Sequence, residues 1–347
     1  MQMNVMKNNS LFPALWLWLF LSVGLFPLFT SCTKEVEFKD KESHPRLVLN
    51  GIVTAGDSIR FNVGKSVFFL DGVMDVSTPE GTEVQLFVNG SRQDGLVVTD
   101  DTLYDYSVGY NDTYRHMIVK RFTSGYVAQR GDKVRVTVSA PGFETIEAEC
   151  EVKQDEPQAE VSYVMADSMI SSYLDYDSTY YYSYKLDVRL KLTDSSPGNR
   201  DCFLIRMNPT YGKMTGKAYW SAFCDSDDPI IGGKSVISDW IGMELNSYVL
   251  FNDELFDGKS YTIRLSVSVF GQAMPGTNVS DLNLELLHLN GDLYQYYKTN
   301  GGEQELWTSL FYEPVQTHNN IKNGYGIWGS AAVQQIPFRL IIETPAP

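Results

Sequence analysis

The chain has 347 residues, with 43 acidic and 28 basic side chains and a formal net charge of −15 at pH 7. Proteins that bind the phosphate backbone of nucleic acids need clustered Lys and Arg. No such cluster occurs here, so nucleic acid is excluded as an expected partner. The length exceeds that of one hydrophobic core, which predicts two domains. Frequent Tyr and regularly spaced turn residues are typical of short β-strands, so the expected class is all-β.

The first 31 residues have the pattern of a bacterial lipoprotein signal. Lys7 precedes an apolar run at residues 11–29, and two small polar residues then lead directly to Cys32. This order is the secretory pattern, and a cysteine at the first mature position supplies the thiol that bacteria acylate, for example with palmitate. The alternative of a transmembrane anchor is disfavoured, because two prolines and a glycine interrupt the run. We therefore expect residues 1–31 to be cleaved and Cys32 to be lipidated.

A tether and a first domain are expected after the signal. Residues 32–45 comprise the lipidated cysteine and a charged segment with little to bury, which predicts a flexible tether. Alternating apolar and polar residues then predict the strands of an immunoglobulin-like β-sandwich at residues 46–153. Asn89-Gly90 predicts a hairpin turn that leads into the strand at 96–99. The predicted strands of this domain are 46–53, 58–65, 83–89, 96–99, 133–139 and 144–152.

A second β-rich domain is expected at residues 158–347, after the acidic, proline-containing boundary at 154–157. One segment, residues 292–299, predicts a helix, because three apolar or aromatic side chains share a face before Asn300-Gly301-Gly302. The expected fold is thus all-β, with two β-sandwich-like domains and one or two short helices in the second. Its predicted strands are 159–165, 184–192, 202–207, 213–223, 260–270, 282–289 and 337–342.

Three cysteines remain once Cys32 is acylated, an odd number that cannot all pair within one chain. Cys150 lies in an alternating row and is expected to be a small buried thiol. Cys202 and Cys224 either form a disulfide between two strands or remain free, and the sequence leaves both possibilities open.

No pattern of catalytic or metal-binding residues is present. The four histidines are far apart, with no His-x-x-x-His pair, and the Gly-x-Ser-x-Gly elbow of a serine hydrolase is missing. Carboxylates are abundant, but no rule selects a glycosidase pair among them. Residues 225–228 are acidic yet lack the glycine and terminal glutamate of an EF-hand loop, which favours a solvated loop over a calcium site. We expect no catalytic residue, no metal and no cofactor.

Two tyrosine-rich acidic segments are the candidate binding surface. Tyrosine offers a large contact area with few rotatable bonds and a polar tip, and recognition loops are rich in it. Strand tyrosines that pack on a sheet produce the same pattern, so a structural role is the alternative. The candidate residues are Tyr104, Tyr106 and Tyr110 in the first domain and Tyr173, Tyr176, Tyr180 and Tyr181 at the start of the second.

Several segments resemble a known family. They are Leu-Asn-Gly-Asp-Leu-Tyr-Gln-Tyr-Tyr-Lys at 289–298, Asn-Ile-Lys-Asn-Gly-Tyr-Gly-Ile-Trp-Gly at 320–329, Asn-Asp-Glu-Leu-Phe-Asp-Gly-Lys at 252–259 and the opening at 32–38. Together they resemble the Bacteroidota lipoproteins grouped as domain of unknown function family 4249. Within the segment at 320–329, Asn323-Gly324-Tyr325-Gly326 predicts a turn that Tyr325 and Trp328 clamp onto the second domain.

The resemblance implies an outer-membrane lipoprotein, often encoded beside a TonB-dependent transporter, with a β-sandwich N-terminal domain and no established catalytic residues. Lys34 and Glu35 resemble the signal that sends such lipoproteins to the cell surface. We therefore expect a surface-exposed, lipid-anchored protein that acts as a non-catalytic binding or docking accessory of a TonB-dependent transporter. The alternatives are a surface hydrolase of glycans or peptides and a structural or adhesion protein of the envelope.

Overall fold

A computed structural model describes residues 44–67, 75–105, 115–155, 157–171, 180–194, 196–208, 213–215, 218–238, 244–273, 278–300 and 317–341. The chain divides into two compact units at residues 1–44 and 45–347, and nearly all described residues belong to the second. The expected signal peptide, Cys32 and the tether up to residue 43 lie outside them. No helix among these residues is both long and apolar enough to cross a membrane.

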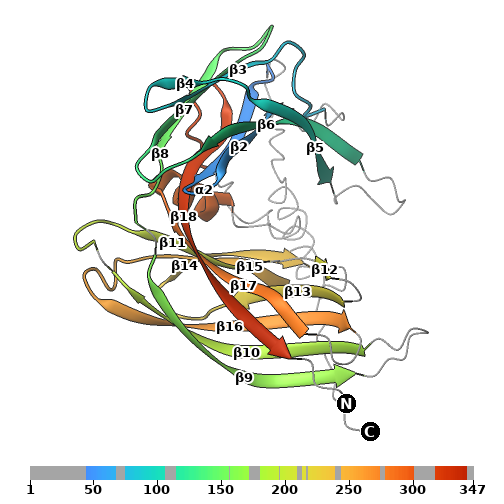
Figure 1. Cartoon of the computed structure of the whole chain (residues 1–347), viewed down its shortest axis with the longest axis vertical. Coiled ribbons are helices and arrows are strands. Elements are labelled where there is room, and N and C mark those ends of the chain that lie inside the picture. The colour runs from blue at the N-terminus through green and yellow to red at the C-terminus, as the bar shows by residue number, and fades with distance from the viewer. Residues whose placement is uncertain are drawn as a thin grey trace, which may run out of the picture. The chain divides into compact units, whose positions relative to one another are not determined.

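The described residues of the second unit form three sheets, which confirms the all-β class (Figure 1). The nine-stranded sheet has the order β14 (Ile231–Ser238), β15 (Glu244–Asn252), β11 (Cys202–Asn208), β17 (Asn278–Leu289), β18 (Tyr325–Ile341), β1 (Leu47–Thr54), β2 (Ser58–Lys65), β6 (Arg115–Val127) and β5 (Val97–Asp105). The five-stranded sheet has the order β12 (Lys213–Thr215), β13 (Ala218–Asp225), β16 (Ser260–Ala273), β10 (Tyr180–Thr193) and β9 (Ala159–Ser171). The four-stranded sheet has the order β4 (Ser91–Gln93), β3 (Glu83–Val88), β7 (Lys133–Ser139) and β8 (Ile146–Glu151).

The last strand, β18, links the two predicted domains. Its first part pairs in parallel with β1, from Tyr325 opposite Val48 to Ala331 opposite Thr54. From Ala331 onward it pairs antiparallel with β17. The nine-stranded sheet therefore contains strands from both sides of the predicted boundary at 154–157, and β18 completes the N-terminal part from the far end of the sequence.

The first core, which we call the N-terminal core, lies between strands β1, β2 and β6 and the four-stranded sheet. Val134, Val136 and Val138 of β7 are fully buried, as their alternation with polar residues predicts. Trp328 of β18 lies in this core, where its ring meets Phe61 edge-on at a centroid distance of 5.4 Å. Trp328 therefore packs in the N-terminal core, and the expectation that it clamps a turn onto the second domain was wrong.

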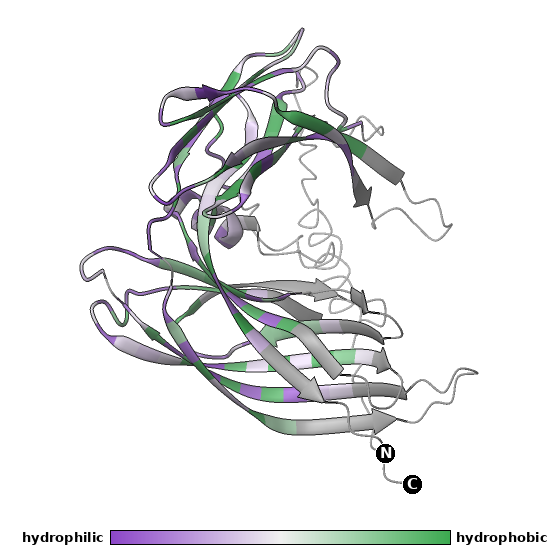
Figure 2. Cartoon of the chain, viewed as in Figure 1, coloured by the Kyte–Doolittle hydropathy of each residue, from purple (hydrophilic) through white to green (hydrophobic). Residues whose placement is uncertain are grey.

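The second core lies between the five-stranded sheet and the other end of the nine-stranded sheet. Along β10, Leu186, Val188, Leu190 and Leu192 are buried while the residues between them are exposed. Figure 2 shows this alternation of hydrophobic and hydrophilic residues along the strands. The inward side chains of β11, β15, β16 and β17 complete this core.

The single helix among the described residues, α2 (Gly291–Asn300), matches the predicted helix at 292–299. It covers the other face of the nine-stranded sheet, where Leu293 and Tyr294 pack with Leu204, Leu250 and Leu287 of the sheet. This end of the molecule thus has three layers: five-stranded sheet, nine-stranded sheet and helix.

Two local predictions differ from the structure. The Asn89-Gly90 turn leads into β4, whereas the strand predicted at 96–99 belongs to β5 and pairs with β6 in another sheet. Cys202 and Cys224 are free thiols in different cores, so they form no disulfide, and Cys150 is buried as expected. Burial raises the pKa of Cys150 and Cys224 to about 12 and that of Cys202 to about 11, which keeps all three protonated at neutral pH.

Candidate functional site

The tyrosine-rich segments fall largely outside the described residues. Tyr106, Tyr110, Tyr173 and Tyr176 are not among them. For Tyr104, Tyr180 and Tyr181 only the strand backbone is described, in β5 and β10. Whether these seven tyrosines form a binding surface therefore stays a prediction.

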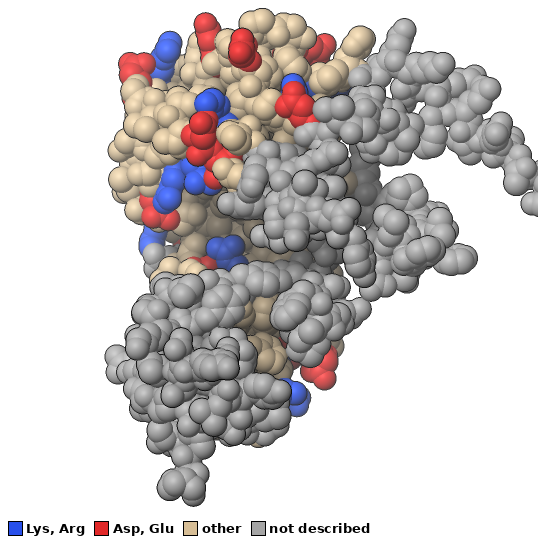
Figure 3. Space-filling view, turned by 90° about the vertical axis from the view of Figure 1, so that its right-hand side faces the viewer, with Lys and Arg blue, Asp and Glu red and all other residues tan. Residues whose placement is uncertain are grey.

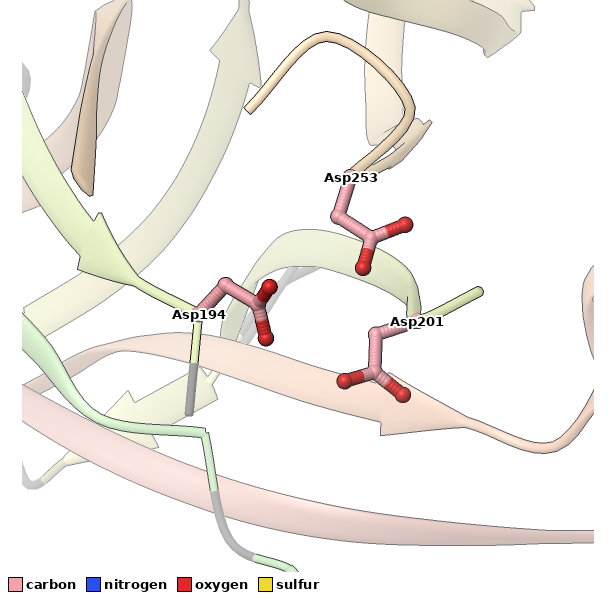
Figure 4. A group of neighbouring side chains, drawn as sticks. All are labelled: Asp194, Asp201 and Asp253. Atoms are coloured by element: carbon pink, nitrogen blue, oxygen red, sulfur yellow. The ribbon is translucent and has the colours of Figure 1, made fainter. Parts of the chain in front are cut away.

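Three buried carboxylates meet where strands of two sheets end (Figure 4). Asp194 directly follows β10, Asp201 directly precedes β11, and Asp253 directly follows β15. One carboxylate oxygen from each lies within 4.8 Å of the other two. The exposed fractions of the residues are 9%, 7% and 1%, respectively. We call this group the aspartate cluster.

The connections that carry the aspartate cluster are bound to each other. Asp253 donates its backbone N–H to the carbonyl of Asp201 at 3.1 Å, and Asp194 donates its N–H to the carbonyl of Lys259 at 3.1 Å. The Asp194 carboxylate accepts the N–H of Ser196 at 2.7 Å and also that of Gly258. These bonds hold the β10–β11 and β15–β16 connections together.

The partners of the three carboxylates differ. Asp201 Oδ1 lies 2.9 Å from His288 Nε2 and 3.7 Å from Lys153 Nζ, and the other ring nitrogen of His288 lies 3.1 Å from the carbonyl of Asp155. Asp253 Oδ2, in contrast, is buried and has no hydrogen-bond partner among the residues that the structure describes. Figure 4 shows its carboxylate directed into the space between Asp194 and Asp201.

Electrostatic repulsion makes the aspartate cluster costly. Two unit negative charges 4.8 Å apart repel by roughly 3.5 kcal/mol at an effective dielectric constant of about 20. Burial raises the pKa of Asp253, and the nearby charges of Asp201 and Asp194 raise it further. Such an arrangement needs a neutralising partner, and carboxylate oxygens are hard ligands suited to a cation.

The acidic segment at residues 225–228 has another role. Its Asp228 is buried and accepts hydrogen bonds from the hydroxyl of Tyr261 at 2.8 Å and from the N–H of Ile230 at 3.3 Å. Ser226 is also buried and donates to the carbonyl of Arg264 at 2.7 Å. The predicted solvated loop is therefore solvated only in part: Asp225 and Asp227 are exposed, whereas Ser226 and Asp228 fasten the turn to β16.

A cavity of about 480 Å³ lies beside the β1–β2 turn, lined by residues that include Ile52, Asp57, Leu287 and Gln335. Its charged lining residues are Asp57, Arg206 and Glu285, and the Glu285 carboxylate accepts hydrogen bonds from Arg206 Nε at 2.7 Å and Asn208 Nδ2 at 2.8 Å. The Glu285 carboxylate is thus satisfied within the protein, and the ion pair serves mainly to join β11 to β17.

An exposed apolar segment lies on the outermost strand of the five-stranded sheet. Val164 and Met165 of β9 are 65% and 51% exposed, and as successive strand residues they point to opposite faces. β9 pairs with β10 on one side, and no described strand pairs with its other side. Figure 3 shows charges of both signs intermixed on the described part of one face. Lys120 pairs with Asp100, and Arg121 pairs with Asp101.

The family comparison agrees with the resemblance of the sequence segments. The family described as a domain of unknown function (DUF4249) matches residues 33–336. The chain belongs to this family. The match covers the residues of both cores, the aspartate cluster and the shared strand β18 as far as residue 336.

The remaining comparisons add no functional information. No curated protein matches the chain. Among solved structures, it aligns with a protein of Corynebacterium diphtheriae described as membrane anchored, at 11% identity over 70% of this chain and 54% of that one, with a TM-score of 0.18. The C-terminal domain of the antigen I/II-family protein AspA of Streptococcus pyogenes aligns at 8% identity over 71% and 94%, with a TM-score of 0.16. Such low TM-scores carry no argument about fold or function.

Proposed function

We propose that this DUF4249 protein is lipid-anchored through Cys32 at the outer membrane of a Bacteroidota cell, with its body exposed at the surface. There it acts as a non-catalytic docking accessory of a TonB-dependent transporter. Three features that follow one another in the sequence support the anchor: a secretory signal, Cys32 and a charged tether. The tether ends where the second compact unit begins. The transporter as partner rests on the family resemblance.

The observation that carries the docking role is the exposed apolar segment of β9. Natural sheets protect their outer strands with Lys, Pro or short length, because an open strand edge pairs with other chains. β9 has 13 residues and contains neither Lys nor Pro, and its protection is limited to Glu160, Asp167 and a bulge at Ala166, where its register with β10 shifts. Val164 and Met165 add apolar contact area on both faces, which is the arrangement that strand addition by a partner uses.

The burial of the aspartate cluster supports a non-catalytic role for it. A hydrolase of glycans or peptides needs its carboxylates within reach of a polymer. Asp253 is 1% exposed and Asp201 is 7% exposed, so a polymer has no access to them in this conformation.

The anchor is tested by the Cys32→Ala variant and metabolic labelling with a fatty-acid analogue. We expect the wild-type chain to incorporate the label and to be digested by protease added to intact cells. The variant should lose the label and either leave the membrane or accumulate as precursor. Label retained in the variant would refute lipidation at Cys32, and full protection of the wild type from protease would refute surface exposure.

Docking is tested by affinity purification from native membranes with mass spectrometry. The double variant Val164→Lys, Met165→Lys should recover at least tenfold less TonB-dependent transporter than the wild type, because two charges disfavour strand pairing at this edge. Val98→Lys is the matched control, since Val98 is 50% exposed on β5, the outer strand of another sheet. Equal loss in both variants, or no transporter with the wild type, would overturn the proposal.

A further inference from the structure

The orphaned oxygen of Asp253 points to a ligand that the polypeptide does not supply. A buried polar atom without a partner loses the hydrogen bonds it had in water, and native proteins rarely leave such a group unmatched. The Asp253 carboxylate faces two further carboxylates, and one oxygen from each of the three lies within 4.8 Å of the other two. From this geometry we infer that Asp194, Asp201 and Asp253 form a binding site for a calcium ion.

The spacing of the three oxygens suits calcium. Ca²⁺ binds oxygen at about 2.3–2.6 Å, so two oxygens on the same ion lie at most about 5 Å apart. The limit of 4.8 Å within the aspartate cluster satisfies this condition. Mg²⁺ binds at about 2.0–2.1 Å, demands a near-octahedral shell and keeps most of its waters, which a buried site of carboxylates suits poorly.

The charge of the cluster is also suitable. Three carboxylates converge, and the nearest fixed positive charge is Lys153, whose Nζ lies 3.7 Å from Asp201 Oδ1. The neighbouring Arg200 pairs with Glu254 at 3.2 Å and so is engaged outside the cluster. With Lys153, the three carboxylates keep a formal charge of −2, which a divalent cation coordinated by the Asp253 carboxylate would balance.

The site is preformed by the backbone around it. Asp194 and Asp201 begin and end the β10–β11 connection, and Asp253 opens the β15–β16 connection. These connections already share the bonds from Asp253 to Asp201 and from Asp194 to Lys259. Calcium would therefore fasten three strand ends of two facing sheets at one point, and its binding should stabilise the fold.

The test measures calcium binding by the full-length chain, purified in detergent and freed of metal with EDTA. Isothermal titration with CaCl₂ should show one site per chain. Calcium at 100 times its Kd should raise the Tm by roughly 4 °C, the shift that this degree of saturation gives in a chain of about 300 residues. MgCl₂ should bind at least tenfold more weakly.

The decisive variant is Asp253→Asn, which keeps the size of the side chain and removes its charge. It should bind calcium at least tenfold more weakly and lose the calcium-dependent Tm shift, while its Tm in EDTA should equal or exceed that of the wild type. Asp253→Ser serves as a second variant if the first does not fold. Asp227→Asn is the matched control, because it makes the same change at an exposed aspartate outside the cluster, and it should keep the wild-type shift. Absence of binding at millimolar calcium, equal affinity for magnesium, or wild-type affinity in Asp253→Asn would overturn the inference.

Discussion

The size of the residue at position 51 in β1 is limited by Trp328, which lies 277 positions later in the chain. A Cβ atom at Gly51 would lie 2.5 Å from a ring carbon of Trp328 and 2.8 Å from Cβ of Phe61. The indole is fully buried and donates its Nε1–H to the carbonyl of Val134 at 3.0 Å, so it is held from two sides. The ring therefore has little freedom to move away.

We predict that Gly51→Ala lowers the free energy of unfolding by about 1–3 kcal/mol, the usual cost of forcing an extra methyl group into a packed core. Gly125→Ala is the control, because a Cβ atom there meets nothing within 4 Å and the strand backbone suits alanine. It should be neutral or slightly stabilising. Chemical denaturation of both variants measures the difference, and equal stabilities would show that the Trp328 ring yields easily.

Asp132 is a buried carboxylate whose bonds are all supplied by the protein. It accepts hydrogen bonds from Asn89 Nδ2 at 2.8 Å, from the hydroxyl of Tyr126 at 2.9 Å and from the N–H of Gln129 at 2.7 Å. Burial alone would raise its pKa, but these bonds outweigh that effect and lower the pKa below the usual 3.8. The carboxylate thereby joins the β3–β4 turn to the β6–β7 turn.

Asp132→Asn should lower the free energy of unfolding by about 1–3 kcal/mol at pH 7, because the new amide group faces the amide donor of Asn89. Since the folded pKa is the lower one, this stabilisation is complete above the unfolded pKa near 4 and disappears as the pH falls through the folded pKa. The variant should therefore lose less stability than the wild type between pH 5 and pH 2. Asp94→Asn, at an exposed position, should behave as the wild type at all pH values, and denaturation curves across this range measure all three proteins.

The aspartate cluster was not predicted from the sequence, because its residues are seven and fifty-two positions apart and follow no ligand spacing. The sequence signal was modest. Asp194 and Asp201 stand beside predicted strands, whereas Asp253 follows β15, which was not predicted. The acidic run at 225–228 attracted attention instead, although Asp228 is held by Tyr261 and Ile230. Convergence of carboxylates depends on strand order, and strand order is not encoded in local periodicity.

At the scale of elements, alternation predicted strands whose two faces differ in burial. The observed β2 and β7 have the predicted bounds, and β1, β3 and β8 differ by one or two residues at their ends. β4, β6, β14 and β15 were not predicted, and neither was the part of β18 before residue 337. Two glycines in β18, Gly326 at φ +118° and Gly329, suggest a turn in the sequence. In the structure, Gly326 lets β1 approach β18 closely, and Gly329 lets α2 do so.

The start of α2 depends on Asn290, which caps the helix and also ties it to β18. Its Oδ1 accepts the N–H of Leu293 at 3.1 Å and that of Ser330 at 3.2 Å, and its own N–H donates to the carbonyl of Ser330 at 3.0 Å. One side-chain oxygen thus satisfies donors of two elements.

Asn290→Ala should reduce the free energy of unfolding by about 1–2 kcal/mol, since it removes the cap and leaves the Ser330 N–H without its partner. Asn290→Asp retains the acceptor and places a negative charge at the helix N-terminus, where charge of this sign is favourable. It should remain within about 0.5 kcal/mol of the wild type. Urea midpoints of the three proteins give the comparison. An alanine variant as stable as the wild type would show that water takes over the hydrogen bonds of the Asn290 side chain.

At the scale of the whole molecule, the N-terminal core is built from two distant parts of the sequence. Ile321 and Trp328 are buried in it, and β18 supplies the parallel neighbour of β1. Ser330 adds a hydrogen bond to the carbonyl of Glu151 at 2.6 Å, and Gln334 exchanges hydrogen bonds with Ala159 at 2.9 and 3.1 Å. Residues 46–153 alone therefore contain the strands of a sandwich but lack part of its interior.

We predict that residues 46–153 expressed alone do not fold stably. Loss of the Ile321 and Trp328 side chains from the core costs about 5–9 kcal/mol, which equals the total stability of many domains. The same segment joined through a Gly/Ser linker to residues 317–334 should fold, because the missing strand is restored. Trp328 is then the only tryptophan in the fused chain, so blue-shifted fluorescence that reverts in denaturant reports its burial directly. A cooperative unfolding transition in the 46–153 fragment alone would show that β18 is an addition to a self-sufficient sandwich rather than a part of its core.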